Sequence, residues 1–548
     1  MDQPANSNGD ASTTELDAVV IGSGFAGLYA LHKLRNGLGL NVRSFDDAGD
    51  VGGTWYWNRY PGARSDTEVT AYCYSFDREL FNDWKWTERY PRQHEILNYL
   101  NHVADRYDLR RSITFDTTIK SAVFNEVTNR WEVLTSGGEQ ITAQFLVAGV
   151  GLLSSTVYPD YKGIDTFAGQ TYHTARWPLE GFDLSGKRVG VIGTGSSGVQ
   201  LITDVAPQVD KLVVFQRRPQ YSVPAQHGPI PSETLAGIHA DYDGYWDSVR
   251  KSITAFGFAE SAVPAMSVSE DERERVFEEA WNIGGGFRYM FATFGDIGVD
   301  PVSNEAAAAF IRRKIKEIVK DPKTAEALTP YDLYARRPLC DAGYYETFNR
   351  DNVEIVDLRV DPIEEITPTG VRTASGDHAL DVIVFATGFD AVTGNYVKID
   401  IQGRNGEQLR DKWVDGPRCH LGVVNAGYPN MFMIFGPMGP FTNQPPAHET
   451  QVDWIAGAIE RVRASGAGFI EATKEAEDAW VDECNTIAHA TLFTKIDSWI
   501  NGANVEGKPV SVMFYMAGMG AYCDRLQQLV DNDYEGFTVG SPASDVNA

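Results

Sequence analysis

A glycine motif that occurs twice constrains this chain more than any other feature. The first copy contains Gly22, Gly24 and Gly27, between an apolar run at residues 16–21 and a helical pattern at residues 25–36. Gly22 permits a tight turn, Gly24 lets the backbone approach a pyrophosphate, and Gly27 allows close packing of helix on strand. The phosphates then lie at the positive end of the helix. This order of elements predicts a dinucleotide-binding unit.

An acidic residue strengthens this prediction. Residues 41–45 form a second expected strand, which ends at Asp46, 19 residues after Gly27. A carboxylate at this place accepts hydrogen bonds from a ribose diol. A glycine motif alone is a weak indicator, but strand, helix and acid together favour a nucleotide site over a glycine-rich turn without a ligand.

The second copy contains Gly193, Gly195 and Gly198, again between an expected strand and an expected helix. The strand that follows it ends in Arg217 and Arg218 instead of an acid. An acid there would repel a 2′-phosphate, whereas guanidinium groups bind it with two parallel hydrogen bonds. The second site should therefore prefer NADPH over NADH. The alternative is two solvated surface arginines.

Strands and helices alternate with short connections around both motifs, which predicts parallel sheets. We expect an α/β fold with two Rossmann-like dinucleotide-binding domains, one for FAD and one for NADP, and a mainly helical insertion. Two dinucleotide sites in one chain indicate electron transfer from a nicotinamide to a flavin, and the N-terminal site usually holds FAD in such proteins. The expected parts are a tail (1–14), the FAD domain (15–150 and 381–540), the NADP domain (151–230 and 331–380), the helical insertion (231–330) and a second tail (541–548).

Charge and cysteine use narrow the classes of partner. The net charge of −27 argues against nucleic acid and against an anionic membrane. No run approaches the ~18 apolar residues of a membrane span, and the polar first residues do not resemble a signal peptide. The five cysteines are scattered, which suits a reducing cytoplasm and makes no disulfide framework. We expect a cytoplasmic monomer with small-molecule partners, and neither nucleic acid, membrane nor metal among them.

Flavin disulfide reductases need a cysteine pair, so flavin monooxygenases are the main remaining class. Residues 167–178 decide among these. They match the pattern F-x-G-x-x-x-H-x-x-x-W-P at every defined position, through Phe167, Gly169, His173, Trp177 and Pro178. This pattern is the fingerprint of Baeyer–Villiger monooxygenases, and the chain resembles the cyclohexanone monooxygenase type of that family from about residue 16 to 537.

The resemblance implies a type I Baeyer–Villiger monooxygenase. In such enzymes an FAD C4a-peroxide inserts one oxygen atom of O₂ next to the carbonyl of a cyclic ketone, giving a lactone, with NADPH as reductant. By resemblance Arg337 supplies the fixed positive charge beside the peroxide, since an arginine does not lose its proton. Asp66 resembles the carboxylate that orients this arginine. We expect His173 to be a hinge or hydrogen-bonding residue and not a chemical base.

The remaining site residues follow from the loops and the resemblance. Those expected at the cofactors are Gly22, Gly24, Phe25, Gly27, Asp46, Gly53, Thr54, Trp55, Tyr72, Gly193, Thr194, Gly195, Ser196, Ser197, Gly198, Gln200, Arg217, Arg218, Lys495 and Trp499. Those expected at the ketone are Leu152, Phe256, Phe441, Thr442, Gln444 and Phe514. Two residues depart from the family pattern: Gln444 replaces an apolar residue and Met438 an asparagine. A buried glutamine needs hydrogen-bond partners, so Gln444 could change the shape or polarity of the substrate, which leaves the ketone open.

Three other functions stay open. Two are neighbouring chemistries, namely oxygenation of nitrogen or sulfur, and an NADPH oxidase that releases H₂O₂. The third is a non-catalytic redox sensor that binds nucleotides. The fingerprint weighs against the first two, and Arg337 with Asp66 weighs against the third.

Overall fold

The first glycine loop follows the central strand of a sheet in this computed structural model, which describes residues 13–541. Strand β1 (Thr14–Ile21) pairs in parallel with β2 (Val42–Phe45) on one side and β6 (Gln140–Ala148) on the other. The strand order is β17-β4-β5-β6-β1-β2-β3, and β18 also pairs with β6. The remaining strands of this sheet are β3 (Ile113–Thr114), β4 (Ile119–Asn125), β5 (Arg130–Thr135), β17 (Asp400–Gln402) and β18 (Met431–Met433).

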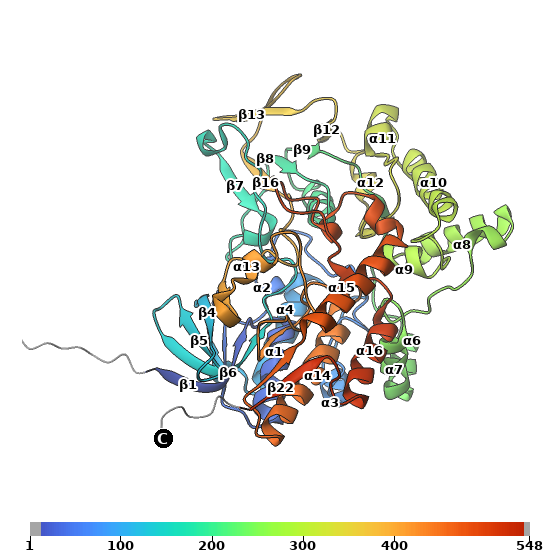
Figure 1. Cartoon of the computed structure of the whole chain (residues 1–548). Coiled ribbons are helices and arrows are strands. Elements are labelled where there is room, and N and C mark those ends of the chain that lie inside the picture. Colours follow the sequence, from blue (N-terminus) through green and yellow to red (C-terminus); the bar gives the residue numbers. More distant parts are fainter. Residues whose placement is uncertain (1–12, 542–548) are drawn as a thin grey trace, which may run out of the picture.

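Two helices cover this sheet in the lower part of Figure 1. Helix α1 (Phe25–Leu31) is buried at every residue and continues into a wider π-helical turn, η1 (His32–Gly37). The long helix α14 (Gln444–Ala464) packs against α1. The helix expected at residues 25–36 is therefore confirmed, although its last turns are not α-helical.

The second glycine loop follows β8 in a separate parallel sheet, in the upper part of Figure 1. Its strand order is β12-β9-β8-β16-β7, and α5 (Ser196–Val205) follows β8. Apolar runs explain its three inner strands, β9, β8 and β16, since the middle of a parallel sheet is covered on both faces. Their bounds are β7 (Gln170–His173), β8 (Arg188–Ile192), β9 (Lys211–Gln216), β12 (Val353–Asp357) and β16 (Val382–Phe385).

Strand β16 corrects one expected domain boundary. The boundary at residue 381 assigns this strand to the FAD domain, but β16 pairs with β8 and β7 of the second sheet. Its four residues are all buried, and they fill the gap between these two strands. A four-residue apolar run indicates burial but carries no signal of which sheet buries it. The crossing back to the first sheet therefore comes after Phe385, and the other boundaries stay predictions.

Residues 231–330 contain helices and no strand, at the right of Figure 1. Ser269 caps α8 by accepting a hydrogen bond from the Glu272 N–H at 3.2 Å. Asp321 caps α11, and Pro322 opens it. These helices are α6 (Ser232–Ala240), α7 (Tyr242–Lys251), α8 (Glu270–Ile283), α9 (Gly286–Phe291), α10 (Pro301–Ile318) and α11 (Pro322–Leu328).

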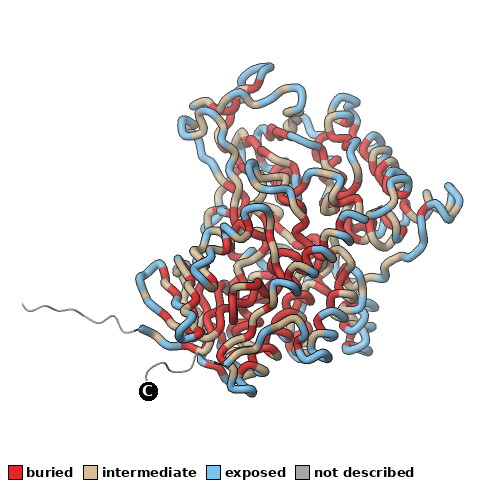
Figure 2. The backbone as a smooth tube through the Cα atoms, viewed as in Figure 1, coloured by how far each residue is buried: buried red, intermediate tan, exposed pale blue. Residues whose placement is uncertain are grey.

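The other elements connect and cover the two sheets. The helices are α2 (Thr54–Trp57), α3 (Arg78–Asp83), α4 (Gln93–Arg106), α12 (Tyr344–Thr347), α13 (Leu409–Lys412), α15 (Lys474–His489) and α16 (Met519–Asp531). The strands are β10 (Ser222–Pro224), β11 (Leu339–Asp341), β13 (Ile363–Thr367), β14 (Gly370–Thr373), β15 (Gly376–Ala379), β19 (Gly439–Pro440), β20 (Phe469–Ala472), β21 (Phe514–Tyr515) and β22 (Phe537–Gly540). Figure 2 shows the buried residues gathered along the interior segments, with exposed residues at the outer turns.

The expected N-terminal tail is too long at one end, because Thr14 already begins β1. Residues 1–12 and 542–548 lie outside the described residues, so the rest of the tail predictions is not addressed. Within residues 13–541, no helix is long and apolar enough to cross a membrane.

A glycine substitution tests the packing of α1 on β1. A Cβ at Gly27 would lie 1.8 Å from the Gly22 carbonyl oxygen, a backbone atom that cannot move aside cheaply. We expect Gly27→Ala to lower the free energy of unfolding by at least about 2 kcal/mol and to reduce FAD retention. Gly237→Ala is the control, because nothing lies within 4 Å of a Cβ at that exposed helical position. Equal thermal midpoints and flavin content for the two variants would contradict the proposed packing.

Candidate active site

Both glycine loops open onto one cavity of about 1420 Å³ between the two sheets. The cavity lies beyond the carboxyl ends of β1 and β8, where open α/β sheets place their ligands. Of all the predicted site residues, only Gly27, Gly198 and Lys495 do not line it. Residues far apart in the sequence are therefore brought to one place.

Two of these three exceptions have a packing explanation. A Cβ at Gly27 or Gly198 would lie 1.8 or 2.2 Å from the carbonyl oxygen of the first glycine of its own loop. Both glycines thus bring a helix close to a strand instead of facing a ligand. Lys495 ends the short helix η7 (Leu492–Lys495) and does not reach the cavity wall.

The first half of the cavity fits a flavin dinucleotide. Gly24 precedes α1 without a side-chain cap, so the first N–H groups of the helix face the cavity. A Cβ at Gly24 would lie 3.3 Å from the Gly53 Cα, so the backbones of these two glycines lie close together in the cavity lining. The Asp46 carboxylate accepts hydrogen bonds from the Ser23 hydroxyl at 2.7 Å and the Ala48 N–H at 2.9 Å. Burial raises the pKa of Asp46, and these hydrogen bonds oppose that rise.

Aromatic side chains wall this half beside the glycines. The Trp55 indole N–H donates to the Tyr72 hydroxyl at 3.2 Å, and the Phe25 ring meets the Tyr72 ring edge-on at 5.4 Å. Burial raises the pKa of Tyr72 to about 12, which keeps its hydroxyl protonated. A flat, apolar wall with few polar groups suits a flavin ring.

The second half of the cavity carries the two arginines. Gly195 precedes α5, again without a side-chain cap, so this helix also presents free N–H groups. Arg218 pairs with Asp497 at 3.2 Å, whereas Arg217 forms no ion pair within residues 13–541. Arg217 is therefore the better candidate for a 2′-phosphate.

Arg337 and Asp66 meet in the cavity between the two halves. The Arg337 Nη1 donates to the Asp66 Oδ2 at 2.7 Å and to the Ser196 hydroxyl at 2.5 Å. The Asp66 side chain is 3% exposed, whereas that of Arg337 is 25% exposed. The Arg337 guanidinium also lies 5.1 Å from the centre of the Phe287 ring. A carboxylate this deeply buried fixes its arginine while leaving part of the guanidinium open to the cavity.

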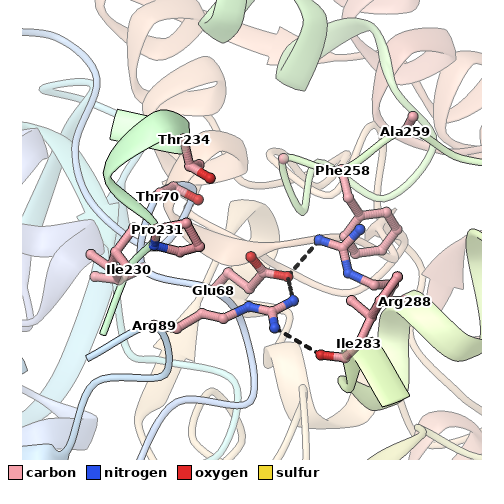
Figure 3. A pocket seen from close by; sticks show the side chains of 12 residues that line it. Glu68, Thr70, Arg89, Ile230, Pro231, Thr234, Phe258, Ala259, Ile283 and Arg288 are labelled. Carbon is pink, nitrogen blue, oxygen red and sulfur yellow. Dashed lines mark hydrogen bonds and ion pairs between the residues drawn. The ribbon is translucent and has the colours of Figure 1, made fainter. Parts of the chain in front are cut away.

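A second cavity, of about 330 Å³, is lined by Glu68, Arg89 and Arg288 among others and is shown in Figure 3. There the Glu68 Oε1 accepts hydrogen bonds from Arg89 at 2.7 Å and from Arg288 at 2.6 Å. Burial acts to raise the pKa of Glu68, but the two arginines lower it below its ordinary value. Glu68 lies two residues from Asp66, and Arg288 follows Phe287 on α9. The Glu68–Arg288 ion pair therefore joins the segment that carries Asp66 to the helix that carries Phe287, the ring beside Arg337. No local pattern in the sequence indicates it.

The predicted ketone pocket is largely aromatic. The Phe441 and Phe514 rings lie 5.3 Å apart, and the Trp499 and Phe514 rings lie 6.0 Å apart. Phe256 stacks at 4.1 Å on Phe287, which also lines the cavity and which sequence reasoning missed. Phe287 lies in an aromatic-rich segment of the helical insertion with Tyr289 and Phe291, which is the one local signal for it.

Polar and aliphatic residues complete the pocket. Leu152 is buried, and the Thr442 hydroxyl donates to the Thr254 carbonyl at 2.6 Å. Gln444 is half-buried. It is the first residue of α14, and it lines the cavity. Met438 is buried behind the wall and does not line it.

His173 lies at the end of β7, outside the cavity lining. Burial lowers its pKa to about 4, so the ring is neutral near pH 7. Its Nδ1 accepts a hydrogen bond from the Ala175 N–H at 3.1 Å. This geometry favours the predicted hydrogen-bonding role.

Two nucleotide loops that share a cavity with a buried Asp–Arg pair define a flavin-dependent oxidoreductase with a second nucleotide site. The family model described as flavin-binding monooxygenase-like matches residues 17–225. A Baeyer–Villiger monooxygenase from Pseudooceanicola batsensis is 57% identical over 95% of each chain. A phenazine N-monooxygenase from Lysobacter antibioticus is 51% identical over 98% of this chain and all of its own length.

A solved structure of cyclohexanone monooxygenase from Rhodococcus sp. Phi1, bound to NADP⁺, is 57% identical. It superimposes with a TM-score of 0.95 and covers 97% of this chain and 100% of its own. The chain belongs to the Baeyer–Villiger monooxygenase family, and its cofactors are FAD and NADPH. The predicted family, fold class and cofactors are thus confirmed.

The position of Arg217 leads to a prediction about nucleotide choice. We expect Arg217→Ala to raise the KM for NADPH about tenfold or more, because a charge-assisted hydrogen bond to the 2′-phosphate is lost. The KM for NADH should change little. Arg218→Ala is the matched control and should have the smaller effect, since Arg218 is already paired with Asp497. Steady-state kinetics with both nucleotides measure this, and an equal loss with NADH and NADPH would contradict it.

Proposed function

We propose that this enzyme inserts one oxygen atom of O₂ beside the carbonyl of a cyclic ketone and so forms a lactone. The observation that carries this proposal is the Arg337–Asp66 pair, 2.7 Å apart, in a cavity that both nucleotide loops share. A fixed positive charge between an electron donor and a flavin suits a reaction that develops negative charge on oxygen.

When bound, NADPH would supply two electrons to the flavin, and the reduced flavin would activate O₂, which provides the inserted oxygen atom and leaves the other as water. Arg337 holds a positive charge in the cavity at every working pH, since a guanidinium does not lose its proton. As the ketone carbon becomes tetrahedral, its oxygen gains negative charge, and the exposed part of the guanidinium stabilises that charge. Asp66 keeps the guanidinium in place and so avoids a reorganisation cost during the reaction.

The lining supports a ring-shaped, mostly apolar ketone of the cyclohexanone kind. Phe256, Phe441 and Phe514 offer flat apolar surfaces to such a ring. The half-buried Gln444 adds one polar group at the start of α14. We propose that Gln444 widens acceptance to ketones with a polar substituent that can reach its amide.

A second candidate function is oxygenation of an aromatic ring nitrogen. The 51% identity to a phenazine N-monooxygenase favours it, because the two chains match over nearly their full lengths. The aromatic lining would accept a flat heterocycle as readily as a ketone ring. The two functions differ in their product, a lactone or an N-oxide.

We also infer a cytoplasmic monomer that acts without nucleic acid or membrane. The net charge of −27 and the unpaired, scattered cysteines support this inference.

A substrate panel tests the proposed function. NADPH oxidation is measured in air with cyclic ketones, acyclic ketones and phenazines, and products are identified by mass spectrometry. We expect cyclic ketones to gain one oxygen atom as lactones. Formation of N-oxides without any lactone would favour the second function, and H₂O₂ alone would indicate an oxidase.

Substitution of Arg337 tests the catalytic assignment. We expect Arg337→Ala to lower the kcat of lactone formation at least about 100-fold, because the charge that stabilises the oxygen is lost. NADPH should still reduce the flavin, and H₂O₂ should replace the lactone. Arg337→Lys keeps the charge without the forked geometry and should retain part of the activity. Full lactone formation by Arg337→Ala would rule the assignment out.

A further inference from the structure

Both oxygens of the Asp66 carboxylate are held by side chains of helix α5. The Asp66 Oδ1 accepts a hydrogen bond from the Gln200 amide at 2.7 Å, and the Oδ2 accepts from the Ser196 hydroxyl at 3.2 Å. We propose that Gln200, locked by Tyr60, is a positioning residue for oxygen insertion: it holds Asp66 in the orientation that fixes Arg337. The inference rests on the proposed function and assigns Gln200 to the catalytic pair instead of to a cofactor.

The orientation of the Gln200 amide follows from its partners. Its oxygen accepts from the Tyr60 hydroxyl at 2.8 Å and from the Arg64 N–H at 3.3 Å. Its nitrogen donates to Asp66 and to the Arg64 carbonyl, at 2.7 and 3.2 Å. Burial raises the pKa of Tyr60, so its hydroxyl stays a donor. A flipped amide would set its oxygen against the Asp66 carboxylate and its nitrogen against the Arg64 N–H, so these two partners exclude that arrangement.

Little of the surface of these three residues is exposed. Tyr60, Gln200 and Asp66 are each 7% exposed. The turn between Tyr60 and Arg64 lies directly on α5, since a Cβ at Gly62 would come within 2.5 Å of the Gln200 carbonyl oxygen. Because the turn and the helix are in contact, the hydrogen bonds between them keep a fixed geometry.

Helix α5 thereby serves two parts of the site. Ser196 and Gln200 are four residues apart, so they lie on one face of the helix and both reach Asp66. Ser196 also directly follows Gly195 of the second loop and is the first residue of α5. The helix end that faces the nucleotide is thus the one that orients the catalytic pair.

Substitutions of Gln200 and of Tyr60 test this proposal. Gln200→Leu removes the donor to Asp66, and Tyr60→Phe removes the group that orients the amide. We expect Gln200→Leu to lower the kcat of lactone formation about tenfold, with more H₂O₂ per NADPH oxidised and little change in the KM for the ketone. Tyr60→Phe should do the same more weakly. In the double variant Tyr60→Phe should add nothing, because Tyr60 acts only through Gln200.

Gln216→Leu is the matched control. Gln216 is also buried and donates its amide to a backbone carbonyl, at 2.7 Å, but it does not line the cavity. The Gln216→Leu variant should have a lower free energy of unfolding than the parent enzyme but the same ratio of lactone to H₂O₂. Additive effects of Tyr60→Phe and Gln200→Leu, or an unchanged product ratio in Gln200→Leu, would overturn the proposal.

Crystal structures of Gln200→Leu and Tyr60→Phe give a readout that does not depend on the reaction. We expect the Asp66 carboxylate to rotate and its contact with Arg337 to lengthen beyond 4 Å. An unchanged Asp66–Arg337 pair in both structures would overturn the proposal. If the parent enzyme forms no lactone, the proposed function fails, and the crystal structures still decide whether Gln200 positions Asp66.

Discussion

The ion pair between Asp66 and Arg337 is the interaction on which the rest of the site depends. A carboxylate that is 3% exposed is costly unless every lone pair has a partner. Its three partners come from two places: Arg337 lies before β11, and Ser196 and Gln200 lie on α5. Asp66 itself lies in the stretch of chain that connects β2 to β3 of the first sheet. The pair therefore joins the two nucleotide halves, and its geometry depends on how they meet.

The two nucleotide halves present the same backbone arrangement. In each sheet one strand leads into a glycine loop, and the helix after the loop has no side-chain cap on its first N–H groups. These groups need a partner, and the phosphates of a dinucleotide provide one. The second helix has the additional task of holding Asp66, so the positions of nucleotide and catalytic pair are coupled by one rigid element.

Much of the fold could be predicted from local pattern. The strands on either side of both glycine motifs were predicted, since each contains a short apolar run. The sheet that contains β16 could not be predicted, because its four apolar residues do not indicate which strands they pair with. The half-burial of Gln444 likewise depends on where α14 begins relative to the cavity.

The site was predictable only where a motif or a resemblance covered it. The glycine loops are local patterns, and Arg337 and Asp66 followed from the family likeness. The hydrogen bond from Tyr60 to Gln200 spans 140 positions, and that from Arg288 to Glu68 spans 220. No spacing rule links such residues, so these contacts required the folded structure.

Isotope labelling tests the central claim most directly. The enzyme is supplied with NADPH, a cyclic ketone and ¹⁸O₂ in ordinary water, and the lactone is analysed by mass spectrometry. The account predicts one ¹⁸O atom per lactone, in the ring position beside the former carbonyl carbon. A lactone without the label, or label found only in H₂O₂, would contradict it.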